Sequence, residues 1–196
     1  PEATPEKRVE AAPERPRDRA EAGAGLKDIT AATETDAVVA IKRALRYFLE
    51  QERDDAKKYA GFVFGISRAL VWGKLVIPAS EDGVTVLNAP DAAIQSKVRE
   101  WFSQKEWDRL IPAIESNFLD EDSSFKYWLT AQRFLCGGLE QKGGPAASSS
   151  EEIRLSLARL VQRSPEFVRL RFSNKTPFAD EETARWIEES VKPLQG

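Results

Sequence analysis

The residues of this chain that could do chemistry are mostly carboxylates, and the densest group is Asp120, Glu121 and Asp122. A glycosidase needs two carboxylates facing one cleft, and a hard-cation site needs several converging oxygens. These three residues are consecutive and lack the alternating spacing of a calcium loop. Negative charge near the N-terminus of the next helix explains them more simply. We therefore predict no catalytic residue, no metal ligand and no cofactor here.

Nucleophile and zinc chemistry is restricted by the absence of histidine and by the single cysteine, Cys136. Without them the chain has no Cys/His zinc site, no Ser–His or Cys–His pair and no intrachain disulfide. A lone cysteine in a helical pattern is typical of a small buried hydrophobe, and an unpaired thiol fits a reducing compartment such as the cytoplasm. The glycines follow no strand and precede no GK[ST] signature, so no phosphate loop is indicated.

Tryptophan is frequent enough to suggest a ligand cage or a sugar platform. Each tryptophan, however, lies at helical spacing among aliphatic neighbours, which favours packing in a core. The five are Trp72, Trp101, Trp107, Trp128 and Trp186.

Arg68 lies inside the most apolar stretch of the chain. A guanidinium in that setting must reach a carboxylate, carbonyl oxygens or solvent. Two interpretations stay open, a structural ion pair that fixes the register of the helix and a contact with a partner protein.

The element that must position these residues is a helix over residues 59–75, which we expect to be the buried centre of the domain. Six of its residues fall on one face at helical spacing. They are Tyr59, Phe62, Val63, Ile66, Leu70 and Gly73. Gly61 and Gly65 remove side chains from one ridge, so that another element can approach the backbone closely.

Periodicity elsewhere predicts an all-α fold of about seven helices, packed as antiparallel pairs around that central helix. We expect the first helix to run from an N-cap at Thr35 to about residue 52, and the last to start at Asp180. Further helix starts are predicted at Pro90 and at two capping boxes. The boxes are Ser103 with Glu106 and Ser149 with Glu152. A short extended piece is expected at residues 84–87, beside Asp82-Gly83.

The N-terminal residues differ in composition from the rest of the chain. Residues 1–27 contain no aromatic residue, four prolines and alternating charges that cancel, so they cannot bury enough apolar surface to offset chain entropy. We expect residues 1–34 to be a disordered linker and residues 35–196 to be one helical domain. The absence of Met and the start at Pro1 predict a piece of a longer protein.

Charge and hydropathy argue against two further classes of protein. Lys and Arg total 29 against 32 for Asp and Glu, a net charge of −3, whereas a dedicated nucleic-acid binder usually has a basic excess. No apolar run approaches the ~20 residues that a membrane span needs.

Three stretches share the motifs of a known family. They read SRALVWGKLVIP at 67–78, KEWDRLIPAIES at 105–116 and LRFSNKTPFADEETARWI at 170–187. Over residues 36–189 the chain resembles the middle domain of TssA (ImpA/VasJ-type) proteins of the bacterial type VI secretion system. That family has an R-x-x-x-W-G helix, a proline-bearing loop, a tryptophan-centred helix and a closing F-x-x-x-T-P-F-A-D-x-x-T-x-x-W segment. The matching residues are Arg68, Trp72, Gly73, Pro78, Trp107, Phe172, Thr176, Pro177, Phe178, Ala179, Asp180, Thr183 and Trp186.

The resemblance implies that these residues are mostly structural and that the protein is a non-enzymatic, cytoplasmic assembly factor. Such proteins associate with the baseplate and the distal end of the growing tail, and they help the sheath and inner tube to polymerise. The implied partners are baseplate, sheath and inner-tube proteins, without nucleic acid or cofactor. A homodimer of this domain is expected, with higher oligomers formed through a C-terminal domain that we expect to lie outside this chain.

Two alternatives remain beside the assembly role. A carboxylate-dependent hydrolase on a helical scaffold requires two acidic side chains within about 10 Å across a pocket, at least one with a raised pKa. A nucleic-acid adaptor would use a basic group near the C-terminus. That group is Arg154, Arg159, Arg163, Arg169 and Arg171.

Overall fold

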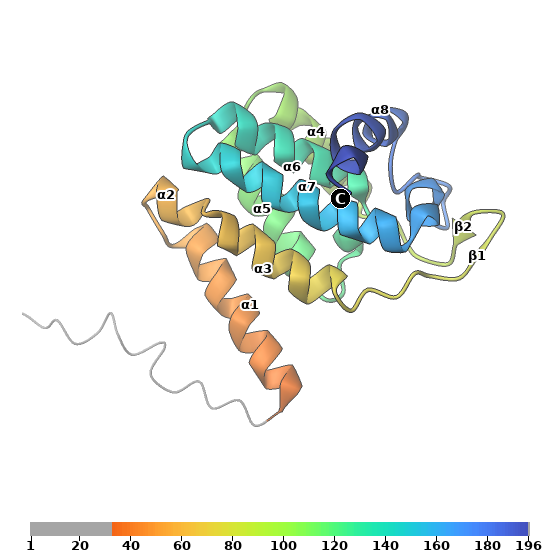
Figure 1. The fold of residues 1–196 in the computed structure, drawn as a ribbon, viewed down its shortest axis with the longest axis horizontal. Coiled ribbons are helices and arrows are strands. Elements are labelled where there is room, and N and C mark those ends of the chain that lie inside the picture. The colour runs from red at the N-terminus through yellow and green to blue at the C-terminus, as the bar shows by residue number, and fades with distance from the viewer. Residues whose placement is uncertain (1–32, 196) are drawn as a thin grey trace, which may run out of the picture.

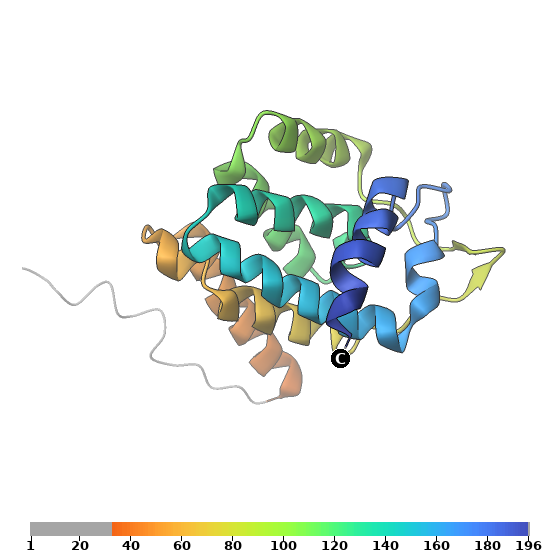
Figure 2. The ribbon, with the colours of Figure 1, turned by 45° about the horizontal axis from the view of Figure 1, so that its top comes forward.

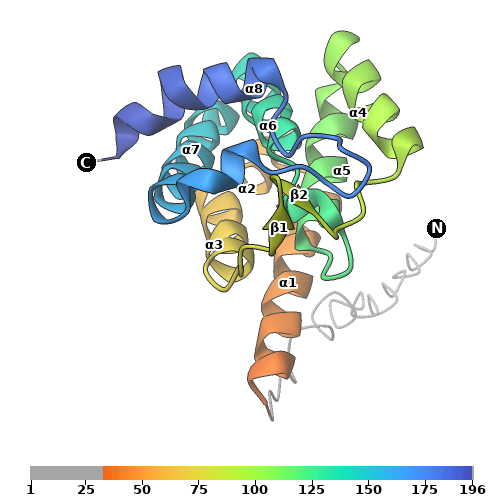
Figure 3. The same cartoon turned by 90° about the vertical axis from the view of Figure 1, so that its right-hand side faces the viewer.

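Thr33 starts the first helix of the computed structural model, which describes residues 33–195 (Figure 1). Its hydroxyl accepts a hydrogen bond from the Asp36 backbone, and the Asp36 carboxylate accepts one from the Thr33 backbone. This capping box begins α1, Glu34–Glu50, two residues before the predicted N-cap at Thr35. The N-terminal half of α1 extends away from the other helices (Figures 1 and 3). The predicted disordered tail lies outside the described residues, except for residues 33 and 34 at the start of α1.

The predicted all-α class is confirmed, because the structure is 69% helical and 4% strand. In the described part of the chain the helices after α1 are α2 (Asp55–Lys58), α3 (Gly61–Trp72), α4 (Ala92–Ser103), α5 (Trp107–Leu119), α6 (Leu129–Lys142), α7 (Pro145–Arg163) and α8 (Glu181–Trp186). The strands are β1 (Ser80–Glu81) and β2 (Val84–Thr85). Short 3-10 turns lie at Ser124–Lys126, Pro165–Arg169 and Lys192–Leu194, and a π-helical turn at Ile187–Val191 continues α8.

The buried central helix exists, but it is α6. Figure 2 shows α6 between α4 and α7, with α3 beyond α7. The buried residues of α6 lie on most of its sides, and they are Leu129, Thr130, Ala131, Gln132, Phe134, Leu135, Cys136, Gly138 and Leu139. On its buried sides such a helix must carry apolar residues, or polar residues that form hydrogen bonds inside the protein. The buried sides of α6 carry small residues and polar residues that form such hydrogen bonds.

The predicted inner face of α3 is wrong for two of its largest members. Phe62 is 50% exposed and Ile66 is 40% exposed, whereas Phe64, Arg68 and Trp72 point into the protein. Periodicity could not separate the sides, because apolar residues occur almost all round this helix. Which side of α3 faces the interior is determined by the polar partners that Arg68 finds inside the protein.

The glycine ridge of α3 packs against α7, as predicted. A Cβ added at Gly61 would lie 3.2 Å from Cγ of Glu152, and one at Gly65 would lie 3.5 Å from Oε2 of the same residue. At the other end, Arg163 donates a hydrogen bond to the Trp72 carbonyl. The start of α3 therefore lies beside the middle of α7 and the ends of the two helices are adjacent, which means that the two helices run parallel.

Helices α6 and α7 form an antiparallel pair through a tight turn at Gly143 and Gly144, which have φ of 74° and 55°. Gly137 and Gly138 lie inside α6. A Cβ at Gly137 would come within 3.0 Å of the Phe102 ring, and one at Gly138 within 3.3 Å of Trp107. These glycines let α4 and the start of α5 approach α6 closely.

Both predicted capping boxes after α1 are wrong. Ser103 is the last residue of α4, where its hydroxyl donates to the Glu100 carbonyl. Ser149 lies inside α7, which begins four residues earlier at Pro145, and its hydroxyl donates to the Tyr59 carbonyl. Pro90 also lies outside its helix, because Asp91 is the N-cap of α4. In contrast, Asp180 does cap α8 as predicted.

The expected extended piece is confirmed as a hairpin that holds the C-terminal segment. Asp82 and Gly83, with φ of 50° and 76°, form the turn between β1 and β2. Arg171 donates its backbone N–H to the Gly83 carbonyl and accepts from Thr85. These bonds fix the segment of the third family motif to the loop that follows the first family motif.

Candidate functional site

Arg68 lies in a fully buried polar cluster with Glu115 of α5 and Gln132 of α6. Its side chain and that of Glu115 have no exposed surface. Nη1 of Arg68 is 2.5 Å from both carboxylate oxygens of Glu115, and Nη2 is 2.7 Å from Oε1 of Gln132. Ser67 donates to the same carboxylate at 2.5 Å. Three helices are therefore joined by one charged cluster, as fits an ion pair that fixes helix register.

Aromatic rings complete the surroundings of the Arg68 guanidinium. Its central carbon lies 4.3 Å from the ring centroid of Phe118 and 5.8 Å from that of Trp72. Such cation–π contacts strengthen when water is excluded. Among the described residues, Nε of Arg68 and Nε2 of Gln132 have no hydrogen-bond partner. Because Arg68 is 1% exposed, the interpretation of this residue as a contact to a partner protein is wrong.

Trp72 connects the Arg68 cluster to two other segments. It is 3% exposed and packs edge-to-face against Phe118 at 5.2 Å. Its Nε1 donates to the carbonyl of Lys126 at 3.0 Å, while its own carbonyl accepts from Arg163. Gly73 is the C-cap of α3, and Pro78 lies half-buried in the loop before β1. The first family motif thus builds the end of α3.

Phe178 lies at the centre of the third family motif and in an aromatic cluster. Its ring is 4.5 Å from Phe172 and 5.3 Å from Phe167, measured between centroids. Its backbone is hydrogen-bonded on both sides, to the carbonyl of Leu170 and to the N–H of Thr130. The neighbouring Thr176 and Pro177 are half-buried, and the Thr176 carbonyl closes a turn with the N–H of Phe172.

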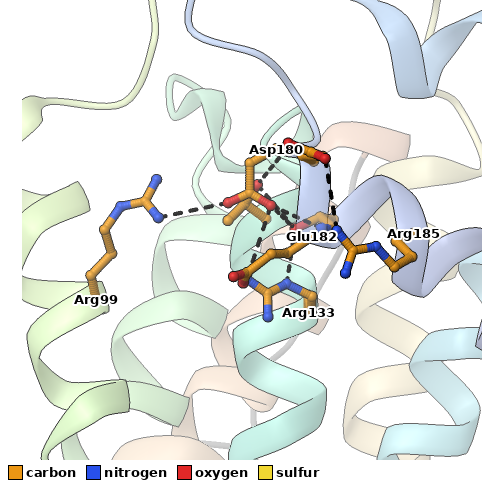
Figure 4. A network of polar contacts seen from close by, with 8 residues as sticks. Arg99, Arg133, Asp180, Glu182 and Arg185 are labelled. Carbon is orange, nitrogen blue, oxygen red and sulfur yellow. Dashed lines mark hydrogen bonds and ion pairs between the residues drawn. The ribbon is translucent and has the colours of Figure 1, made fainter.

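Asp180 connects this motif to α4 and α6, as Figure 4 shows. Its carboxylate accepts from the backbone and the hydroxyl of Thr183, at 2.9 and 2.6 Å. Arg99 of α4 and Arg133 of α6 lie 3.7 and 3.9 Å from the same carboxylate. Burial acts to raise the pKa of Asp180, but the hydrogen bonds from Thr183 and the charges of the two arginines outweigh it and hold the pKa below its ordinary value.

All five tryptophans pack with the core, as predicted. Trp72 and Trp128 are buried, and Trp101, Trp107 and Trp186 are partly buried against the core. Trp107, the centre of the second family motif, meets Phe102 at 5.6 Å. The family-motif residues thus divide into the buried Arg68 cluster, the aromatic packing and the half-buried Asp180 turn, while Gly73 is exposed at the end of α3.

The acidic cluster Asp120, Glu121 and Asp122 makes structural contacts in the described chain. Glu121 pairs with Lys42 of α1 at 2.7 Å, and Asp120 accepts from the backbone of Asp122. Hydrogen bonding from Lys42 lowers the pKa of Glu121. In this part of the chain no group of three or more Cys, Asp or Glu side chains has the geometry of a metal site. The pKa values of Glu52, Asp108, Glu121 and Asp180 lie below their ordinary values, whereas the acid of a hydrolase needs a raised pKa.

The basic group proposed for nucleic acid is divided among different elements. Arg154 lies 3.7 Å from Glu140 of α6, and Arg171 belongs to the backbone bridge beside the hairpin. Only Arg159 and Arg163 lie one helical turn apart, on α7. A continuous basic stripe is therefore missing from this end of the described chain.

The outer side of α3 is the feature that sequence reasoning missed. Phe62 and Ile66 are exposed there, and a groove of about 330 Å³ follows the same helix toward α7. Its walls include Ala69 of α3 and the pair Arg159 and Arg163 of α7. No local signal in the sequence indicated this side, because Ser67 and Arg68 face inward to meet Glu115, 48 and 47 residues away, and thereby turn Ile66 outward. No helix in residues 33–195 has the length and apolarity of a membrane span.

Comparison with protein families matches residues 32–196 to the family described as type VI secretion, EvfE, EvfF, ImpA, BimE, VC_A0119, VasJ. No curated protein matches the chain. The family match covers all three motifs, from Arg68 to Trp186, and the whole of the described structure. The chain therefore belongs to the ImpA/VasJ family of type VI secretion.

Proposed function

We propose that the chain is a non-enzymatic assembly module of the type VI secretion system, which acts at the baseplate and during assembly of the sheath and inner tube. The observation that carries this proposal is the family match over residues 32–196. A match to a secretion component over the whole helical domain favours a role in the secretion machinery.

The way in which the motif residues are used supports a structural role. Arg68 is neutralised by Glu115, and Asp180 is held by Thr183 and two arginines. Charged groups whose hydrogen bonds are taken up inside the protein fix a fold, whereas catalytic groups must reach a substrate. Docking of other proteins then falls to the exterior, where α3 carries the exposed apolar side chains Phe62 and Ile66.

The proposal also includes the partner proteins and the cellular location. We infer contacts with baseplate, sheath or inner-tube proteins in the bacterial cytoplasm, without a cofactor. Residues 35–196 form the domain in this proposal and residues 1–34 its linker. A homodimer through this domain, and higher oligomers through a further C-terminal domain, complete it.

The proposal is tested in a bacterium that carries the corresponding secretion system. The segment equivalent to residues 33–195 is deleted from the full-length protein, and sheath assembly is followed by fluorescence microscopy of a tagged sheath subunit. Release of the inner-tube protein into the medium is measured in parallel. We expect both to be lost. Normal sheath assembly and tube release after the deletion contradict the proposal.

A point variant distinguishes a defect caused by the unfolded domain from a defect caused by degradation of the full-length protein. Arg68→Ala is expected to unfold this domain, and immunoblotting measures how much full-length protein remains. Arg169→Glu, on an exposed residue remote from the Arg68 cluster, serves as the control and should assemble sheaths normally. A sheath defect that follows Arg68→Ala at unchanged protein level supports the domain's direct role.

A further inference from the structure

Two stripes of exposed residues, one on α3 and one on α7, run side by side and form a surface that we call the α3–α7 face. On α3 the stripe is Phe62, Ile66, Ala69 and Gly73, and on α7 it is Glu152, the half-buried Ser156, Arg159 and Arg163. Both follow the spacing i, i+4, i+7, i+11, which keeps residues on one side of a helix. Because α3 and α7 are parallel, the two stripes stay adjacent along their length.

The shape of this face suits a helix. Between the stripes lies the groove of about 330 Å³, whose α3 wall combines the small residues Gly65, Ala69 and Gly73 with the edges of the buried Arg68 and Trp72. Small residues let another backbone approach closely. From Phe62 to Gly73 the stripe extends over about three helical turns, or roughly 16 Å at 1.5 Å per residue. An occupant of three to four turns would fill it.

The chemistry of the face changes from one end to the other. Near the start of α3 it is apolar, because Phe62 and Ile66 are 50% and 40% exposed, and one acidic side chain, Glu152, lies over Gly61 and Gly65 of the same helix. Near the end of α3 it is basic, because Arg159 and Arg163 line the groove. Among the described residues no carboxylate lies within 4.0 Å of either arginine, as their absence from the ion pairs of the structure shows.

We propose that the α3–α7 face binds an amphipathic helix of another protein whose carboxylates meet Arg159 and Arg163. The apolar side of that helix packs on Phe62 and Ile66, as in helix-in-groove recognition. Opposite charge across the groove fixes the direction of the bound helix and favours its encounter. The inference deepens the assembly role proposed above and rests on it for its biological meaning.

The test uses two synthetic peptides of roughly 18 residues, about five helical turns. Both carry leucines at i, i+4, i+7 and i+11, and one has glutamates and the other lysines on the flank facing α7. Binding of each labelled peptide to the full 196-residue chain is measured by fluorescence anisotropy at two salt concentrations. We expect the glutamate peptide to bind at least about tenfold more tightly, and more weakly as salt rises.

Variants assign that binding to the face. The double variant Arg159→Glu/Arg163→Glu should reverse the preference between the peptides, and Phe62→Ser/Ile66→Ser should weaken both by about tenfold or more. Arg169→Glu and Val76→Ser are the matched controls, since Arg169 is exposed and Val76 is 79% exposed outside this face. Circular dichroism verifies that each variant keeps its helical content.

Several outcomes overturn the inference. Equal affinity of the two peptides removes the charge argument, and binding that survives both double variants places the peptide elsewhere. Sedimentation that shows a dimer dissociated by Ile66→Glu assigns the face to a second copy of this chain. A single-stranded oligonucleotide that displaces the glutamate peptide assigns it to nucleic acid. The peptides test the face and sheath assembly tests the secretion role, so that either can fail without the other.

Discussion

In a simple amphipathic helix the charged residues face solvent and the apolar residues face the core, but the two sides of α3 depart from this arrangement. The inner side holds a charged residue, Arg68, and the outer side shows Phe62 and Ile66 to solvent. Inside, the charge is matched by Glu115 and Gln132 and surrounded by aromatic rings. Outside, the aliphatic and aromatic side chains have no comparable partner, apart from an edge-to-face contact between Phe62 and Phe48 at 5.3 Å.

The comparison teaches that burial follows the availability of partners and not polarity alone. A buried guanidinium is tolerated when a carboxylate and an amide oxygen satisfy it, and it then dictates the rotation of its helix. The rotation that brings Arg68 to Glu115 also turns Ile66 outward. An exposed apolar stripe is thus a direct consequence of the internal ion pair.

The largest effect is expected from breaking that ion pair on one side only. Arg68→Ala leaves the Glu115 carboxylate buried without its cation, which typically costs about 3–5 kcal/mol of the free energy of unfolding. Urea denaturation followed by circular dichroism measures the loss. A loss of the whole transition is also consistent, because domains of this size have only about 5–15 kcal/mol in total.

A double variant distinguishes the lost charge from lost packing. Arg68→Met/Glu115→Leu removes both charges and keeps apolar volume, so it should be markedly more stable than Arg68→Ala. The two sites lie in contact, and their effects are therefore not additive. A double variant as unstable as the single one would indicate that packing, and not electrostatics, holds this cluster together.

Truncation of Trp72 tests the inner side while the ion pair between Arg68 and Glu115 stays in place, although it removes one of the rings near the Arg68 guanidinium. Trp72→Ala removes a nearly fully buried ring, its contact with Phe118 and its hydrogen bond to Lys126. We expect a loss of roughly 3–5 kcal/mol in chemical denaturation. A loss below about 1 kcal/mol would be inconsistent with a buried indole at this position.

Asp180 is a charged residue at the edge of the core, and it can be compared with the fully buried Arg68. Asp180→Ala removes the N-cap of α8 and should cost about 1 kcal/mol at pH 7. Asp180→Asn keeps a cap but no charge. Because the pKa of Asp180 in the folded protein lies below its ordinary value, its ionised form stabilises the fold. That contribution is fully present above the unfolded pKa of about 3.9 and is lost as the pH falls through the folded pKa.

The measurement is the difference in unfolding free energy between the wild type and Asp180→Asn, taken from pH 7 down to the acid transition. We expect this difference to shrink with acid. A difference that stays constant or grows would show that the arginines and Thr183 do not favour the charged carboxylate.

The sequence predicted those features that depend on local signals. The all-α class followed from periodicity, the hairpin turn from Asp82-Gly83, and the start of the last helix from Asp180. The close packing at Gly61 and Gly65 was also predictable, because a glycine pair one turn apart leaves a low ridge. Trp107 and Trp186 were correctly placed against the core.

Features that depend on distant partners were not predictable from one sequence. Ser149 resembles an N-cap, yet its hydroxyl meets the carbonyl of Tyr59, 90 residues away in sequence. Glu115 was not singled out, because nothing local distinguishes a buried carboxylate from an exposed one. The rotation of α3 depends on that same pairing, and so the exposed side was assigned incorrectly.

The smallest effect on stability is expected on the outer side of α3. Ile66→Ser removes a 40% exposed side chain and should change the free energy of unfolding by about 0.5 kcal/mol, as is usual for surface positions. Val63→Ala, one turn earlier and fully buried, should cost clearly more. Denaturation of both variants at several protein concentrations gives the comparison. Ile66→Ser could instead lower the free energy of unfolding as much as Val63→Ala does, but only at high protein concentration. That result would show that Ile66 is buried against a second copy of the chain in solution. The inner side of α3 would then be covered by its own chain and the outer side by another copy.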